Sequence, residues 1–190
     1  MTVTATADLN AMSKQALAEL DEALSRIAPE AADVMSDEIL RAGTIVCYGL
    51  GREGLMVRAL SMRLMHLGLR AFVVGDVTTP PVGPGDLVIV SAGPGELKTA
   101  ETIVDLGRQA AARVLVVTAQ PAGTVPSKAD VVVHLPSQTM ADDRGGRSLL
   151  PMGTAFEISM LIFFDLVALV LMRKSGQTME QLRARHFNLE

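Results

Sequence analysis

Cysteine and tryptophan are nearly absent from this 190-residue sequence, which has one cysteine and no tryptophan. A single cysteine, Cys47, excludes a disulfide within the chain, and no group of cysteines and histidines has the spacing of a zinc site. Aromatic residues make up 3% of the chain, so few rings are available to stack on bases or sugars. Cys47 lies inside an apolar run, which indicates a buried, inert thiol rather than a nucleophile.

Positive charge is also scarce: 17 Lys and Arg residues stand against 21 Asp and Glu, a formal net charge of −4. This balance argues against nucleic acid and anionic membranes as partners. The first residues, "MTVTATADLNAMSK", contain no basic stretch followed by an apolar one, so no secretory signal is predicted. The expected compartment is the cytoplasm.

One long apolar segment, "AFEISMLIFFDLVALVLM" at 155–172, approaches the length of a membrane span. Glu157 and Asp165 lie within it, and carboxylates are costly in a bilayer core. We therefore expect a core or subunit-interface helix and no membrane span. This helix and the amphipathic N-terminal helices present more apolar surface than one small sheet can cover, so we predict a homo-oligomer, most simply a tetramer.

Apolar residues, 49% of the chain, occur in short runs that alternate with helical patterns. Residues 8–41 have the spacing of two amphipathic helices, separated at Pro29. Strand-like runs rich in Val, Ile and Leu follow, with helices between them, at 44–50, 70–75, 86–92, 113–120 and 130–136. Such an alternation predicts a parallel sheet covered on both faces. A right-handed, doubly wound order makes it an α/β, flavodoxin-like three-layer sandwich with five parallel strands.

The chain is predicted to be one domain, 1–190, in three parts. Residues 1–43 form an N-terminal helical arm, 44–136 the α/β core, and 151–190 the C-terminal helices and tail. Within the polar segment before the last part, "DDRGGR" at 142–147 is interpreted as a flap or a surface loop.

Three segments follow predicted strands, at the sheet edge where ligands of such folds bind. They are "GLGREG" (49–54), "GDVTTPP" (75–81) and "SAGPGE" (91–96). The first has the glycine spacing G-x-G-x-x-G, and Asp76 is placed as a dinucleotide site requires, so nucleotide binding is an alternative. The same glycines also serve any tight turn from a strand into a helix.

Motifs along nearly the whole chain resemble one known family. "YGLGREGL", "MRLMHLG", "GDLVIVSAGPGE", "LPMGTAFE" and "RARHFNLE" occur in the order typical of the sugar isomerase (SIS) domain family, and most resemble its 6-phospho-3-hexuloisomerase branch. The resemblance implies a tetramer built from dimers. It also implies aldose–ketose isomerisation of a phosphorylated sugar through a cis-enediol, with no metal or organic cofactor.

The resemblance also implies roles for particular residues. Glu157 is the general base that moves a proton between neighbouring sugar carbons, and His186 in the tail assists as an acid–base or ring-opening group, reaching the site of a neighbouring copy. Contacts to a small-molecule sugar substrate are expected from nine residues of the three loops and the helix that follows: Gly51, Arg52, Glu53, Thr79, Ser91, Gly93, Gly95, Glu96 and Lys98.

The chain departs from the family pattern where a phosphate is expected. Glu53 replaces the serine of G-x-G-R-S-G, and "AGPGEL" at 92–97 replaces S-G-S-G-E-T, so four hydroxyls are missing and Pro94 has no N–H. Each hydrogen bond to a charged group contributes about 1.5–3 kcal/mol. We therefore expect a ligand loop with altered phosphate chemistry, in which Arg52 or Lys98 is the charge partner and Glu53 pairs with Arg52 or accepts a hydroxyl of a neutral polyol.

Two other functions fit these residues. One is a non-catalytic sugar-binding module, as SIS domains of transcriptional regulators are, and the other is an isomerase or epimerase of a non-phosphorylated sugar. The retained "FE" and "RH" favour an isomerase.

Overall fold

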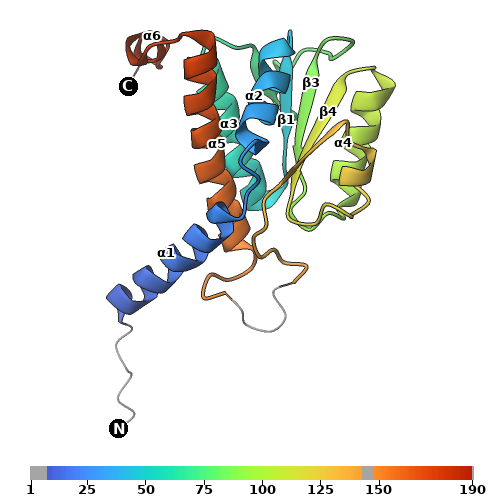
Figure 1. Cartoon of the computed structure of the whole chain (residues 1–190). Coiled ribbons are helices and arrows are strands. Elements are labelled where there is room, and N and C mark those ends of the chain that lie inside the picture. Colours follow the sequence, from blue (N-terminus) through green and yellow to red (C-terminus); the bar gives the residue numbers. More distant parts are fainter. Residues whose placement is uncertain (1–7, 143–147, 190) are drawn as a thin grey trace.

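A five-stranded parallel sheet forms the centre of the molecule (Figure 1). The computed structural model describes residues 8–142 and 148–189. The strands lie in the spatial order β2-β1-β3-β4-β5. This is the doubly wound order predicted from the sequence. In chain order the strands are β1 (Ile45–Tyr48), β2 (Ala71–Val73), β3 (Leu87–Ser91), β4 (Arg113–Thr118) and β5 (Val131–His134).

Helices cover both faces of this sheet, as near-continuous apolar strands require. They are α1 (Leu9–Ser25), α2 (Ala31–Arg41), α3 (Gly51–His66), α4 (Lys98–Gln109), α5 (Thr154–Ser175) and α6 (Met179–Ala184), with a 3₁₀ turn, η1, at Pro126–Lys128. Figure 1 shows α2, α3 and α5 on one side of the sheet and α4 on the other. The three-layer sandwich is therefore confirmed.

Alternate residues of each strand point to opposite layers, because side chains alternate along a strand. Ile89 of β3 packs with α2, α3 and α5 in the larger core, whereas Val88 and Val90 pack with α4 in the smaller one. Cys47 is fully buried in the larger core, and burial raises the pKa of its thiol to about 12. The expectation of an inert cysteine is confirmed.

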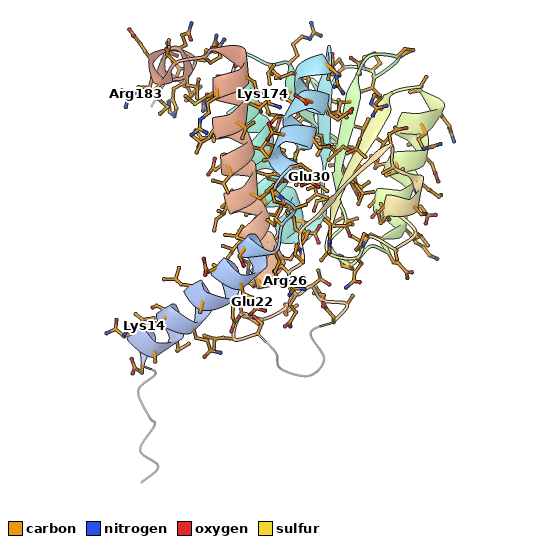
Figure 2. The ribbon with its side chains drawn as sticks, viewed as in Figure 1. Lys14, Glu22, Arg26, Glu30, Lys174 and Arg183 are labelled. Carbon is orange, nitrogen blue, oxygen red and sulfur yellow. The ribbon has the colours of Figure 1, made fainter. Side chains whose placement is uncertain are left out.

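Helix α1 extends away from the body of the molecule. Figure 2 shows Lys14 on its outer part and Glu22 and Arg26 close to the body. Only Leu20 and Ala23 of this helix are buried. Its outer apolar side chains are exposed: Leu9, Met12 and Leu17. The apolar face predicted for this arm therefore exists but is covered only at its inner end.

Helix α5 is long and apolar enough to cross a membrane by length and composition, with a mean hydropathy of 2.3 in its most apolar window. No other helix of the described residues meets these criteria. More than half of that window, 56%, is buried inside the fold, and Lys174 near its end pairs with Asp33 and Asp37 of α2. These are the features of a soluble protein's core helix, as predicted. Residues 143–147 of the predicted flap lie outside the described residues.

Candidate active site

Two glycines allow β1 to turn directly into α3 at the carboxyl edge of the sheet. A Cβ atom on Gly54 would lie 2.6 Å from the Gly49 carbonyl oxygen, so any larger residue would push the turn apart. The G-x-G-x-x-G spacing therefore has a packing cause. Asp76, the acidic residue of the dinucleotide alternative, instead forms an ion pair with Arg58 at 3.0 Å.

The turn brings Arg52 against Glu157 in the first turn of α5. Arg52 Nε lies 2.8 Å from Glu157 Oε2, and Arg52 Nη1 donates to the Thr154 hydroxyl at 3.3 Å. The contact between Arg52 Nε and Glu157 Oε2 is an ion pair without the alignment of a hydrogen bond. Glu157 Oε2 therefore accepts no hydrogen bond from the described residues. Glu157 thus has a neighbouring positive charge but keeps a lone pair for another proton.

Burial sets the protonation behaviour of Glu157. Its side chain is among the buried polar groups, with 9% of the residue exposed. Loss of hydration raises the pKa of this carboxyl above the usual value, and the charge of Arg52 partly opposes the rise. A carboxylate with a raised pKa is a stronger base than an exposed one, which suits proton abstraction.

Glu53, one residue after Arg52, contacts the end of β3 and the loop that follows it. Its Oε2 accepts hydrogen bonds from the Ser91 hydroxyl and, at 3.0 Å, from the Gly93 N–H. Burial raises the pKa of Glu53, these two hydrogen bonds lower it, and the nearby charge of Glu157 raises it again. Of the two partners foreseen for Glu53, the pairing with Arg52 is wrong, because Arg52 pairs with Glu157.

Gly93 makes the approach of Glu53 possible. A Cβ atom at this position would lie 2.8 Å from Glu53 Oε1 and 2.7 Å from the Phe156 ring. The loop after β3, the start of α3 and the start of α5 therefore meet at one point. They bring together five of the predicted site residues with Glu157: Gly51, Arg52, Glu53, Ser91 and Gly93.

The other predicted contacts are placed differently. The Thr79 hydroxyl donates to the Val73 carbonyl at 2.6 Å, which closes the loop after β2. Gly95 has a φ of 76° and packs on Gln120, where a Cβ would lie 2.8 Å from the Gln120 Cβ. Glu96 and Lys98 are exposed, and neither side chain contacts a described residue through a hydrogen bond or ion pair. Lys98 therefore remains a candidate charge partner only for a ligand at the loop surface.

His186 lies at the opposite end of the molecule. Its ring stacks on His66 at the end of α3, with centroids 5.3 Å apart. Arg52 is fourteen residues earlier on the same helix, about 20 Å away at 1.5 Å per residue. Within one chain, His186 and Glu157 are therefore not brought together, which agrees with the expectation that this tail acts in a neighbouring copy.

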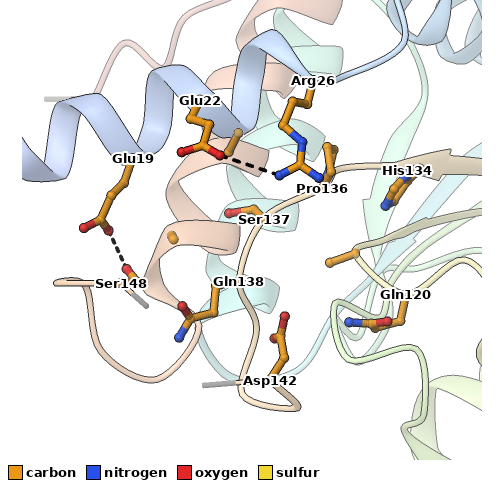
Figure 3. Close-up of a pocket in the computed structure, with 13 residues that line it drawn as sticks. Glu19, Glu22, Arg26, Gln120, His134, Pro136, Ser137, Gln138, Asp142 and Ser148 are labelled. Atoms are coloured by element: carbon orange, nitrogen blue, oxygen red, sulfur yellow. Dashed lines mark hydrogen bonds and ion pairs between the residues drawn. The ribbon is translucent and has the colours of Figure 1, made fainter. Parts of the chain in front are cut away.

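A cavity of about 350 Å³ opens at the ends of β4 and β5, beneath the inner part of α1 (Figure 3). Figure 3 shows Gln120 and His134 on one side, and Glu22 and Arg26 on the other. Neither Glu157 nor Glu53 lines this cavity, although Ala155 of α5 does. His134 is exposed at the end of β5 and lines the cavity. Its position near the end of a predicted strand was the sequence feature that could have indicated a cavity-lining residue.

Comparison with known proteins identifies the family. The SIS domain model matches residues 38–161. The chain is 37% identical to the 3-hexulose-6-phosphate isomerase of Bacillus subtilis over 92% of this chain and 95% of that protein. It is 32% identical to the 3-hexulose-6-phosphate isomerase of Mycobacterium gastri over 90% and 86% of the two chains.

A solved structure agrees. A protein of Methanococcus jannaschii, inferred from its structure to be a 3-hexulose-6-phosphate isomerase, matches with a TM-score of 0.79 and 30% identity over 96% of this chain and 99% of that one. This chain belongs to the SIS domain family. The names of its relatives support the expected isomerase class, acting on sugar phosphates.

Proposed function

We propose that the protein is an aldose–ketose isomerase of a sugar phosphate or a related sugar derivative, with Glu157 as the general base. One observation carries this proposal: a buried carboxylate faces Arg52 at the carboxyl edge of the sheet and keeps an oxygen without an aligned donor. Relatives named as isomerases support the same reaction class.

The reaction needs one proton to move between neighbouring carbons. Glu157 would take a proton from the carbon beside the carbonyl, which leaves a cis-enediol, and would return it to the former carbonyl carbon. A hydroxyl proton must meanwhile move from one oxygen to the other. Arg52 would position the Glu157 carboxylate and stabilise the negative charge that develops on the enediol oxygens.

We assign the oxygen-side proton transfer to His186 of a neighbouring copy. His186 and Glu157 lie at opposite ends of one chain, so a site that contains both requires assembly. Exposed apolar side chains on three helices support an oligomer, which we propose to be a tetramer: Leu9 and Leu17 of α1, Leu55 and Met62 of α3, and Leu166 and Leu169 of α5. The proposed compartment is the cytoplasm, and no cofactor is assigned.

The substitution Glu157→Gln tests the base. It keeps the shape of the side chain but cannot accept a proton, so turnover should fall by about 10²–10⁴-fold while ligand binding remains. Turnover by the unaltered enzyme should also fall as pH decreases, with a midpoint above the usual glutamate value, because burial raises the pKa of Glu157 and the base must be ionised.

Asp165→Asn is the matched control. Asp165 is a carboxylate on the same helix, but it is exposed and pairs with Arg63. Its loss should leave turnover within about twofold, given the small contribution of surface ion pairs. If Glu157→Gln keeps more than a tenth of the activity, Glu157 is not the base.

A further inference from the structure

We propose that Glu53 makes the loop after β3 a binding site for a hydroxyl or amino group of the sugar, and that this loop does not take a phosphate ester. The inference rests on the proposed function in that both place the sugar at the carboxyl edge of β1 and β3. It narrows the substrate to a sugar derivative with no phosphate seated at this position. The relatives above are named as isomerases of a 6-phosphate, so the inference would set the substrate of this chain apart from theirs by its phosphate.

The first argument is that the two donors of the loop that lie against Glu53 are already occupied. The Ser91 hydroxyl and the Gly93 N–H both donate to the same oxygen of Glu53. Of the next two residues, Pro94 has no N–H and the Gly95 N–H donates to the Ala92 carbonyl, so an anion would have to turn to the N–H groups at the start of α4. A phosphate at this point would have to displace a carboxylate from its own hydrogen bonds.

The second argument is charge. Glu53 and Glu157 are close enough for the charge of Glu157 to raise the pKa of Glu53. Arg52, the cation next to Glu53 in the chain, is engaged with Glu157. A phosphate ester carries about 1.5–2 negative charges at neutral pH, so it would be repelled by the carboxylate that faces it.

The third argument is that Glu53 is fixed in place. Its carboxylate fits against Gly93 and the Phe156 ring so closely that a Cβ on Gly93 would overlap both. Such packing holds the carboxylate against the loop rather than leaving it to swing into solvent. The polar cavity beneath α1 is also lined by more negative than positive side chains, since Glu19, Glu22 and Asp142 stand against one cation, Arg26.

The carboxylate of Glu53 is suited to bind a ligand group that donates a hydrogen bond. Oε2 accepts both protein hydrogen bonds, whereas Oε1 accepts none from a described residue. A carboxylate oxygen accepts hydrogen bonds and donates none while ionised. A sugar hydroxyl or an ammonium group supplies the matching donor, and a phosphate dianion does not.

Isothermal titration of the full chain tests this with matched ligands: fructose and glucosamine, the 6-phosphate of each, and inorganic phosphate. The variants are Glu53→Gln, which keeps the shape and removes the charge, and Glu53→Ser, which empties the position. We expect each variant to bind the 6-phosphates and inorganic phosphate at least tenfold more tightly than the unaltered protein does. Binding of the matching unphosphorylated sugar should weaken by a similar factor.

Two results would overturn the inference: micromolar binding of a 6-phosphate by the unaltered protein, or an affinity for the 6-phosphates that changes by less than threefold in both variants. Thermal unfolding of each variant establishes that it is folded before titration. The Glu157→Gln assay keeps this test separate from the proposed function. Isomerisation of a 6-phosphate that depends on Glu157 would leave the function standing and remove only the inference about Glu53.

Discussion

Two glutamates from different helices, Glu53 of α3 and Glu157 of α5, define the candidate site. Glu157 faces Arg52 and keeps an oxygen for a proton, whereas Glu53 uses one oxygen to hold the loop after β3. Burial raises the pKa of both carboxyls. The difference in their hydrogen bonds, rather than in their burial, is what separates a candidate base from a candidate specificity residue.

The packing around Gly93 gives a prediction at the scale of one methyl group. The change Gly93→Ala would place a Cβ atom 2.8 Å from Glu53 Oε1 and 2.7 Å from the Phe156 ring. Such overlaps in a packed site typically cost about 1–3 kcal/mol of stability. Thermal unfolding should therefore begin several degrees lower, at roughly 2–4 °C per kcal/mol for a chain of this size.

Gly83→Ala is the control for this change. A Cβ on Gly83 meets nothing within 4 Å, and this residue has no positive φ. Its replacement should leave the unfolding temperature unchanged or slightly higher, because alanine restricts the unfolded chain. Equal unfolding temperatures for the two variants would show that the contact at Gly93 is not tight.

Sequence reasoning located this site but not its internal pairing. The shared carboxyl edge of parallel strands predicted that the loops carrying Arg52, Glu53 and Ser91 lie close together, and the family resemblance added Glu157 to them. Which carboxylate faces Arg52 depends on how α5 docks against the start of α3, and residues so far apart in sequence leave no local pattern for that. The sequence also did not predict that the Thr79 hydroxyl donates to the Val73 carbonyl, which leaves it engaged within its own loop.

Among the elements, α2 and β4 are joined by an ion pair that sequence patterns did not indicate. Arg113 at the start of β4 forms two hydrogen bonds to Glu38 of α2, at 2.6 and 3.0 Å. Glu38 is 7% exposed, so the hydrogen bonds from its partners replace the contacts with water that its carboxylate loses on burial. Arg41 adds a longer contact at 3.3 Å.

Removing Arg113 should therefore loosen α2 from the sheet. We expect Arg113→Ala to lower the free energy of unfolding by about 1–2 kcal/mol, below the full value of hydrogen bonds to charged groups because half of this side chain is exposed. Chemical denaturation measures the loss. Arg58→Ala, which breaks the exposed pair with Asp76, should cost about 0–1 kcal/mol. A larger loss at Arg58 than at Arg113 would contradict this account.

The elements themselves were largely predictable. Runs of Val, Ile and Leu predicted all five strands, and the helical spacing predicted the helices, because a buried parallel sheet imposes both patterns. The predicted strands were longer than those observed by a few residues at their ends, where the backbone leaves the ladder for a turn. The extension of α1 beyond the body was not predictable, since nothing in its pattern says what its outer apolar side chains contact.

For the whole molecule, the separation of His186 from Glu157 predicts that activity is shared between copies. Glu157→Gln and His186→Gln should each be nearly inactive alone. Mixed oligomers, formed by producing both variants together, should regain roughly a quarter of the activity. About half of randomly assembled pairs are mixed, and each mixed pair rebuilds one of two sites.

The control is to mix the purified variants without exchange of subunits, which should restore nothing. If the co-produced mixture also stays inactive while forming oligomers, His186 does not act on a neighbouring copy. If His186→Gln alone retains full activity, the histidine has no part in the reaction.

The contact of Gly93 with Glu53 and Phe156 also limits the order in which this loop can change during evolution. With both neighbours in place, any side chain at position 93 would overlap them. A substitution at position 93 is therefore expected to cost less after Glu53 or Phe156 has changed than before. This is epistasis with a steric cause: the effect of a substitution at Gly93 depends on whether Glu53 or Phe156 has already been replaced.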